Sequence, residues 1–337
     1  MIKLPKDKSI AQRCAVLNLE FDESFIGEDV KNTLHAANQF ASNKEDLTLD
    51  LGNSGTGIRL LTGYAAGFGK KCTLIGDKSL SKRPMRRISD PLNNWGAKIS
   101  LRDDKYPPIE IGKSKLQSNF VYELEIPSAQ IKSCLLLAAL SSKTRIEIIE
   151  NIPSRDHTER LLKECDAEIL IEGNKIILDG TKEITKKFID VPKDFSSAAY
   201  LIAANILTEK VIPLVGIGVN ETRTAFLNVL EEMGANIELH NYSVISNEPR
   251  ADITASFDKK LKGISISGQK IPNLIDEIPL IAIMAMFAEG KTTIKDAKEL
   301  RYKESDRISL LLSNMKKFNP NIGLKEFDDG FEIIPSK

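Results

Sequence analysis

The chain has 337 residues, of which 42% are hydrophobic and 28% charged, so its composition is that of a folded globular protein and excludes a disordered one. Its 47 basic residues balance 47 acidic residues, which argues against a generalised nucleic-acid-binding protein. The four cysteines form no C-x-x-C pair and the three histidines are scattered, so we expect reduced thiols, no metal site and no cofactor. The first residues lack a signal-peptide core and the longest apolar run, residues 278–288, is too short to span a bilayer, which predicts a cytoplasmic protein.

Taken in chain order, the predicted elements begin with a short polar turn that opens an apolar helix rich in small residues, and this piece recurs along the chain. It occurs at residues 4–17, 51–67, 126–140, 191–205 and 274–290. Apolar residues occupy most faces of each helix, which predicts that all five helices are buried.

A second helix follows each of these, with apolar residues at i, i+3 and i+4 spacing and charges between them, which is typical of an amphipathic helix. Segments of this class, in which the helix often closes in Gly-Ala-x-Ile and a strand, lie at residues 91–99, 160–169 and 227–237, and helices of the same class are predicted at residues 28–40 and 303–318. Short β-rich stretches separate the helices, for example residues 71–77, 144–151, 174–180, 291–297 and 331–335. The pattern predicts an α/β chain of about five β-α-β-α-β units.

Several of the polar turns carry basic or hydroxyl side chains where a helix begins. These residues are Lys8, Ser9 and Arg13; Asn53, Gly55, Thr56 and Arg59; and Ser128, Gln130 and Lys132. A helix N-terminus presents unpaired N–H groups and a partial positive charge, so such turns suit phosphate or carboxylate groups. Ordinary N-capping is the alternative for any single turn, but a cation in the first turn opposes the helix dipole and therefore suggests a bound anion.

Two further segments concentrate charge: residues 81–87 place four cations around a proline, and residues 301–307 hold five charged side chains. On a continuous helix Lys303 and Arg307 would share a face, which is unfavourable for two cations unless an anion lies between them. Ser154 is a candidate N-cap for the helix that follows it. The glycines of GNSGTG read G-x-x-G-x-G, which supports neither a dinucleotide fingerprint nor a P-loop.

Eight motifs connect these segments in order: PKDKSIAQR, LGNSGTGIR, GDKSLSKRPM, PSAQIKS, SRDHTERLL, DFSSAAY, IDEIPLIA and ELRYKESDR. On these motifs, which span the chain from Leu4 to about Ile334, the sequence resembles the family of 5-enolpyruvylshikimate-3-phosphate synthase (3-phosphoshikimate 1-carboxyvinyltransferase) of the shikimate pathway. The forms S-A-Q and S-R-D-H-T-E-R resemble the second sequence class of that family.

The resemblance implies the two-domain enolpyruvyl transferase fold, an inverse α/β barrel with three β-α-β-α-β repeats in each domain and the active site in the cleft between the domains. The upper domain would comprise residues 8–193, and the lower domain residues 1–7 with 194–337. The family's C-terminal segment, with an Asp-His-Arg motif and a later lysine, has no counterpart here, so we expect about five of six repeats. The lower domain would then be incomplete, with about two repeats, and we expect it to be marginally stable.

The implied reaction moves the enolpyruvyl group of phosphoenolpyruvate to the 5-hydroxyl of shikimate-3-phosphate and releases phosphate, and the anionic groups of both substrates account for the basic turns. By motif match, the residues expected to bind shikimate-3-phosphate are Lys8, Ser9, Arg13, Ser128, Ala129, Gln130, Arg155, Asp276 and Lys303. Those expected to bind phosphoenolpyruvate are Lys8, Gly55, Arg83, Gln130 and Arg307. Among the residues expected in catalysis, Asp276 would accept a proton, Glu304 would donate one, and Lys8 is the third. These small molecules are the expected partners, with no nucleic acid, membrane or metal, and a complete chain is expected to be a monomer.

Three other functions stay open on the sequence. The first is a truncated, inactive form that binds shikimate-3-phosphate without turnover, and the second is a structural remnant that binds neither substrate. The third is a UDP-N-acetylglucosamine enolpyruvyl transferase, although the reactive loop cysteine of that enzyme has no clear counterpart here. The resemblance also suggests sensitivity to glyphosate, which mimics phosphoenolpyruvate, because tolerant relatives often carry alanine where this chain has Gly55.

Overall fold

The computed structural model describes residues 2–42, 46–208, 210–257 and 260–336, so residues 1 and 337, the ends of the predicted lower domain, lie outside the described residues. The chain divides into two compact units: the first unit is residues 5–191, and the second unit is residues 1–4 with 192–337. Each unit has a hydrophobic core of its own.

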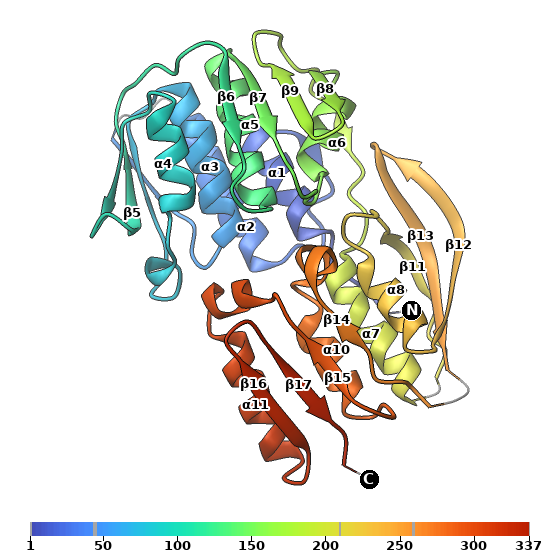
Figure 1. Cartoon of the computed structure of the whole chain (residues 1–337). Coiled ribbons are helices and arrows are strands. Elements are labelled where there is room, and N and C mark those ends of the chain that lie inside the picture. The colour runs from blue at the N-terminus through green and yellow to red at the C-terminus, as the bar shows by residue number, and fades with distance from the viewer. Residues whose placement is uncertain (1, 43–45, 209, 258–259, 337) are drawn as a thin grey trace. The chain divides into compact units, whose positions relative to one another are not determined.

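The first unit alternates short strands and helices (Figure 1). Its helices are α1 (Lys8–Leu17), α2 (Glu28–Ala41), α3 (Gly55–Phe68), the 3-10 turn η1 (Leu80–Lys82), α4 (Arg86–Asn94), α5 (Ala129–Ser142) and α6 (His157–Glu164). Its strands are β1 (Glu20–Phe21), β2 (Leu47–Asp50), β3 (Cys72–Ile75), β4 (Ile99–Arg102), β5 (Tyr106–Ile111), β6 (Phe120–Glu123), β7 (Arg145–Ile149), β8 (Glu168–Glu172), β9 (Lys175–Asp179) and β10 (Phe188–Ile189).

The strands of the first unit form sheets with one repeated topology. Two four-stranded sheets have the orders β2-β3-β5-β4 and β6-β7-β9-β8, and in each the first two strands are parallel while the remaining pairs are antiparallel. A parallel pair needs a crossover helix, which α3 and α5 provide, and an antiparallel hairpin closes each repeat. The predicted β-α-β-α-β unit is therefore one strand longer in the structure. The short strands β1 and β10 form a separate parallel pair.

The second unit repeats this plan. Its helices are α7 (Phe195–Thr208), α8 (Ala225–Glu232), η2 (Gly268–Lys270), α9 (Ile271–Leu274), α10 (Ile278–Ala285), η3 (Lys298–Tyr302) and α11 (Arg307–Phe318). Its strands are β11 (Leu214–Gly218), β12 (Asn236–Ile245), β13 (Glu248–Ser256), β14 (Ser265–Ile266), β15 (Thr292–Ile294), β16 (Gly323–Phe327) and β17 (Gly330–Ile334). The sheet β14-β15-β17-β16 has the parallel–antiparallel–antiparallel order of the first unit, and β11-β13-β12 is fully antiparallel.

The predicted apolar helices are confirmed as α1, α3, α5, α7 and α10, whose side chains supply much of the two cores. Glycines allow α3 and α5, which lie side by side in Figure 1, to approach closely. A Cβ on Gly63 would overlap the backbone carbonyl of Cys134, and one on Gly67 would overlap that of Ala138. This contact aligns two helices whose N-termini both carry predicted site residues.

The helix predicted over residues 303–318 begins later than expected. Asp306 Oδ1 accepts the Ser309 N–H at 3.1 Å and caps α11, so the helix starts at Arg307. Lys303 lies before the cap in extended backbone (φ −77°, ψ −151°). The prediction that Lys303 and Arg307 share a helical face is therefore wrong, because a strong N-cap ended the helical pattern between them.

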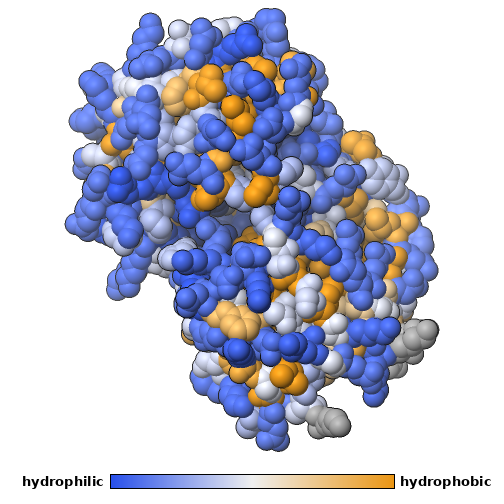
Figure 2. Space-filling model, in the orientation of Figure 1, coloured by the Kyte–Doolittle hydropathy of each residue, from blue (hydrophilic) through white to orange (hydrophobic). Residues whose placement is uncertain are grey.

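Polar side chains cover most of the surface seen in Figure 2, and apolar side chains form small groups. One group lies on the three-stranded sheet, where Leu239, Val244 and Ile245 of β12 are exposed. Within residues 2–42, 46–208, 210–257 and 260–336, every helix is too short or too polar to cross a membrane.

Candidate active site

Three buried helices of the first unit begin at a capping side chain. The capping residues are Asp7 for α1, Ser54 for α3 and Ser128 for α5, at donor–acceptor distances of 3.0, 3.1 and 3.4 Å. N-capping therefore does occur at these turns, but a side-chain cap satisfies only one of the four N–H groups that a helix start leaves open. The predicted site residues of the first unit lie on these helix starts and on two loops beside them.

Arg13 of α1 connects this helix to α5 and α6 through buried hydrogen bonds. Its side chain is buried, and its Nε donates to Thr158 Oγ1 at 2.6 Å while Nη2 donates to Ser133 Oγ at 2.8 Å. Nη1 donates to the Ser9 carbonyl at 2.7 Å. Arg13 was predicted to bind substrate, and in this structure its donors reach α1, α5 and α6, so it connects these three helices.

Lys8 stands outward from the same turn. Its side chain is 52% exposed, and Nζ lies 3.1 Å from Asp29 Oδ2 on α2. The Asp29 carbonyl also accepts a hydrogen bond from Thr33 Oγ1. An exposed ammonium paired with an exposed or partly exposed carboxylate can reach a ligand by exchanging that carboxylate.

Gly55 at the start of α3 lies beside Arg83, the next cation of the predicted site. A Cβ on Gly55 would lie 2.6 Å from Arg83 Nη1 and 3.3 Å from Arg59 Nη1, so the missing side chain lets two guanidinium groups approach the start of α3. Arg83 Nη2 donates to Asn53 Oδ1, and Asn53 Nδ2 donates to Asp77 Oδ2 at 2.6 Å. Arg83 Nε is buried and has no hydrogen-bond partner among the described residues.

Asp77 holds the loop that presents Arg83. Its Oδ1 accepts the N–H groups of Leu80 at 2.7 Å and Ser79 at 2.9 Å. These backbone bonds, the one from Leu80 most of all, lower the pKa of Asp77, and Arg83 adds to the effect. The loop is thus fixed by a carboxylate that stays ionised at neutral pH. Sequence reasoning missed Asp77, although it lies within the GDKSLSKRPM motif.

The third group comprises Ser128, Ala129 and Gln130 at the start of α5, all half-buried. Gln130 Nε2 donates to Thr56 Oγ1 at 3.0 Å and so connects the starts of α5 and α3. Arg155 is half-buried in the loop between β7 and α6. The nine predicted residues of the first unit therefore belong to neighbouring helix starts and loops tied together by hydrogen bonds.

The loop that carries Arg155 does not place Ser154 as the N-cap for which the sequence made it a candidate. Ser154 does not cap α6, because its Oγ donates to Glu150 Oε1 at 2.5 Å and the helix begins at His157 after Asp156. The N-cap prediction for Ser154 is wrong, since a nearby buried carboxylate competes for the hydroxyl.

In the second unit the structure brings Asp276, Glu304 and Arg307 together. Arg307 binds Glu304 with two bonds, Nε to Oε1 at 2.7 Å and Nη2 to Oε2 at 3.0 Å, and its Nη1 lies 3.5 Å from Asp276 Oδ1. Burial opposes the charge on Arg307, but Glu304 and Asp276 outweigh it and raise the pKa of the guanidinium. These three side chains are 24–44% exposed, so the group faces solvent. Lys303, predicted as a fourth member, precedes Glu304 in the chain.

A buried arginine that the sequence reading did not select supports this group. Arg223 is 5% exposed, with Nη1 3.9 Å from Asp276 Oδ2 and Nη2 3.8 Å from Asp194 Oδ2. Nη2 also donates to Ser196 Oγ at 2.7 Å, and Ser196 Oγ donates to Glu277 Oε1. Arg223 therefore places a cation among the starts of α7 and α10, where Asp276 lies. Its only sequence signal was a cation just before a helix.

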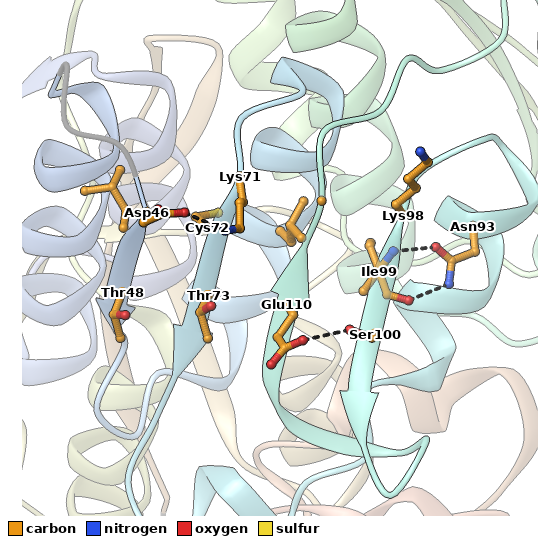
Figure 3. A pocket seen from close by; sticks show the side chains of 13 residues that line it. Asp46, Thr48, Lys71, Cys72, Thr73, Asn93, Lys98, Ile99, Ser100 and Glu110 are labelled. Atoms are coloured by element: carbon orange, nitrogen blue, oxygen red, sulfur yellow. Dashed lines mark hydrogen bonds and ion pairs between the residues drawn. The ribbon is translucent and has the colours of Figure 1, made fainter.

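An open hollow elsewhere on the first unit contains none of the predicted residues. It lies on the face of the β2-β3-β5-β4 sheet, where Thr48, Thr73, Glu110 and Ser100 stand side by side (Figure 3). Ser100 Oγ donates to Glu110 Oε2 at 3.1 Å, and Lys71 Nζ lies 2.6 Å from Asp46 Oδ1. These polar groups already pair with one another on an open sheet face, so the hollow is a weaker candidate for a ligand-binding site than the basic turns.

The chemistry of the two groups differs. The first unit supplies ammonium, guanidinium and amide donors, which suit phosphate and carboxylate oxygens. The second unit supplies two carboxylates beside arginines, which suit proton transfer. No set of three His, Cys, Asp or Glu side chains in the described ranges is arranged to hold a metal ion.

Comparison with known proteins identifies one family. The family model described as EPSP synthase (3-phosphoshikimate 1-carboxyvinyltransferase) matches residues 2–337. A 3-phosphoshikimate 1-carboxyvinyltransferase from Thermoanaerobacter sp. is 39% identical over 358 residues, covering 99% of this chain and 84% of that protein. The protein of the same name from Thermodesulfovibrio yellowstonii is 46% identical over 293 residues, covering 86% of this chain and 67% of that protein.

Solved structures agree with the sequence matches. EPSP synthase from Acinetobacter baumannii superimposes with a TM-score of 0.82 at 34% identity, covering 99% of this chain and 81% of that chain. The enolpyruvyl transferase NikO from Streptomyces tendae gives a TM-score of 0.72 at 13% identity, covering 98% of this chain and 81% of that chain, which is a likeness of fold alone.

Proposed function

The chain belongs to the EPSP synthase (3-phosphoshikimate 1-carboxyvinyltransferase) family, and from that premise we propose that it transfers the enolpyruvyl group of phosphoenolpyruvate to the 5-hydroxyl of shikimate-3-phosphate and releases phosphate. It is a transferase of the shikimate pathway with the predicted enolpyruvyl transferase fold. The names of the relatives do not favour the predicted alternatives, a UDP-N-acetylglucosamine transferase or an inactive binding form. The family match across residues 2–337 is the observation that carries the proposal. We further propose that the first and second units correspond to the upper and lower domains of the family.

Shikimate-3-phosphate is assigned to the starts of α1 and α5. Ser9, Ser128 and the N–H groups of both helices can donate to its phosphate, and the helix dipoles favour the negative charge. Arg155 adds a guanidinium, which binds phosphate or carboxylate with two parallel bonds. The braced turns support this assignment, because binding loses less entropy when donors are held in place beforehand.

Phosphoenolpyruvate is assigned to Lys8, Gly55, Arg83 and Gln130. Arg83 is presented by a fixed loop. Because Gly55 has no side chain, the guanidinium of Arg83 lies close to the start of α3. Lys8 would exchange Asp29 for the ligand. Two cations and a helix start can together bind a dianionic phosphate beside a carboxylate.

The proton transfers are assigned to the second unit, with Asp276 as acceptor and Glu304 as donor. Arg307 now binds both oxygens of Glu304, so binding the phosphate or carboxylate of phosphoenolpyruvate requires Arg307 to exchange Glu304 for the ligand. That exchange would release Glu304 toward the methylene carbon that must be protonated. Lys303 is proposed to contact shikimate-3-phosphate from the segment before α11.

The test is phosphate release by the purified chain with both substrates present and with each omitted in turn. We expect release only when both are present, accompanied by a product with the mass of the enolpyruvyl ether. Release from phosphoenolpyruvate alone would indicate a phosphatase, and no release from folded protein would contradict the proposal. Asp276→Asn, measured in parallel, separates turnover by this chain from a contaminating activity.

A further inference from the structure

A buried ionic cluster lies behind the shikimate-3-phosphate turns, and the proposed chemistry does not use it. Lys132 of α5 is 1% exposed, and its Nζ lies 2.7 Å from Glu150 Oε2 and 2.8 Å from Glu159 Oε1. Glu150 is 8% exposed and Glu159 2%. One ammonium thus bridges two carboxylates on either side of the loop that carries Arg155.

The cluster binds that loop directly. Lys132 Nζ donates to the Ser154 carbonyl at 3.3 Å, and Glu150 Oε1 accepts both the Ser154 N–H at 3.1 Å and the Ser154 hydroxyl. The carbonyl, amide and hydroxyl of one residue are therefore all held by the cluster. Arg155 is the next residue in the chain, so the anchored peptide sets where its side chain departs.

Stability alone does not account for such a cluster. Burying charges costs desolvation energy, and well-packed apolar side chains of similar volume are often as stable. The cluster also contains one cation and two carboxylates. Burial opposes the charge on Lys132, but Glu159 and Glu150 outweigh it and raise the pKa of the ammonium. Burial raises the pKa of Glu159 despite Lys132. Apolar residues could fill this space without loss of stability, yet the cluster makes three hydrogen bonds to Ser154. These bonds fit a role in positioning the loop.

We propose that Lys132, acting with Glu150, is a positioning residue: it anchors Ser154 and thereby fixes Arg155 in the geometry that binds the anionic groups of shikimate-3-phosphate. The inference rests on the proposed function for the role of Arg155. It does not require Lys132 to touch substrate, and a cation buried to 1% exposure is poorly placed to do so.

The anchoring is tested first without any ligand, by hydrogen exchange of the amides in residues 151–156. The main variant is Lys132→Met/Glu150→Leu/Glu159→Met, which removes all three charges together so that none of the three is left unpaired, and we expect it to keep the fold. Lys132→Arg keeps the cation, and Lys143→Met is the matched control, because Lys143 ends the same helix with a side chain 66% exposed.

We expect faster exchange at Ser154 in the triple variant, by about tenfold or more, because its N–H loses a buried acceptor. Lys143→Met should exchange like the parent chain. Unchanged protection at residues 151–156 in a folded triple variant would overturn the proposal, whatever the chain catalyses.

Substrate measurements then test the consequence. In the triple variant, the Kd for shikimate-3-phosphate should rise about 10- to 100-fold, as for loss of one charge-assisted hydrogen bond, while the KM for phosphoenolpyruvate and kcat change less than about threefold. Lys132→Arg should restore most of the affinity. A triple variant that binds shikimate-3-phosphate like the parent would overturn the link to Arg155. A parent chain that binds no shikimate-3-phosphate would instead refute the proposed function, and the exchange result would still decide the anchoring.

Discussion

The two halves of the chain, the first unit and the second unit, hold their predicted site residues in opposite ways. In the first unit, buried cations such as Arg13 and Lys132 bond to neighbouring segments and hold the turns that carry the predicted binding residues. In the second unit, the carboxylates proposed to transfer protons are partly exposed and paired with a cation of the same unit, Arg307. The contrast suggests two kinds of support: buried bonds hold the turns of the first unit in fixed positions, whereas Lys8 and Arg307, both proposed to bind an anion, are held in more exposed ion pairs that a ligand can exchange.

The energetics of the two halves differ accordingly. A buried, fully bonded cation is costly to disturb because its neighbours are left unpaired in a medium of low dielectric constant. A partly exposed ion pair contributes little to stability and is screened by water and salt. We therefore expect substitutions in the first half to lower stability and affinity together, and those in the second half to lower turnover with little change in stability.

The largest effect is expected in the second half. Asp276→Asn and Glu304→Gln should each lower kcat by about 10²- to 10⁴-fold, because each removes one partner of a proton transfer. Phosphate release measures this loss, and thermal unfolding should show the same midpoint as the parent within a few degrees. Glu231→Gln, an exposed acidic residue of the same unit, serves as the control and should keep full activity. A Glu304→Gln chain with near-parental kcat would refute its role as proton donor.

Glu304→Gln also tests whether the ion pair must be exchanged. If Glu304 competes with phosphoenolpyruvate for Arg307, its neutral replacement should leave the Kd for phosphoenolpyruvate unchanged or lower it, although kcat falls. Equilibrium binding in the presence of shikimate-3-phosphate measures this Kd. A clear rise in Kd would show instead that Glu304 contributes to binding, and the proposed exchange would be abandoned.

In the first half, Arg13→Lys should lower the free energy of unfolding by about 2–4 kcal/mol, because an ammonium cannot reproduce the three-way bonding of the guanidinium to Thr158, Ser133 and Ser9. Urea unfolding provides the measurement. Arg145→Lys on the exposed face of β7 is the control and should change stability by less than about 0.5 kcal/mol. An Arg13→Lys chain as stable as the parent would contradict the bracing role.

Gly55→Ala should act on phosphoenolpyruvate alone. The new methyl group would press against Arg83 Nη1, so the KM for phosphoenolpyruvate should rise about tenfold while the Kd for shikimate-3-phosphate stays within about threefold. Glyphosate inhibition should weaken by at least as much, in line with the family resemblance. Gly27→Ala is the control, because a Cβ there meets nothing within 4 Å. An equal loss of affinity for both substrates would show that Gly55 matters for the packing of the unit and not specifically for phosphoenolpyruvate.

The smallest effect concerns the thiols of the first unit. Burial raises the pKa of Cys72 and Cys134 to about 12 and that of Cys165 to about 11. Because a raised pKa keeps a thiol neutral, about one in a thousand or fewer should be ionised at pH 8, and alkylation by iodoacetamide should be negligible in the native chain. Mass spectrometry should find modification only after unfolding. Rapid labelling at pH 8 would show that this half is less rigid than proposed.

Local pattern predicted the elements well. Apolar runs at helical spacing identified α1, α3, α5, α7 and α10, and the motifs identified the family. These features depend on residues within a few turns of one another, which the sequence displays directly. Where a local competitor was overlooked, the prediction failed: Asp306 stopped a helix that was expected to run through Lys303, and Glu150 took the hydroxyl expected to cap α6.

The sequence by itself determined the alternation of strands and helices, except for one strand of each four-stranded repeat, and it determined most of the cation-bearing helix starts and the family, because spacing and capping chemistry are local. Only the tertiary structure decided which cations stay accessible and which are buried among partners from distant segments. Arg13 and Arg83 look alike in the sequence, yet Arg13 bonds Thr158, 145 positions away, and is buried. The desolvation of a buried charge is set by partners brought from distant segments, and no local pattern records which segments will meet.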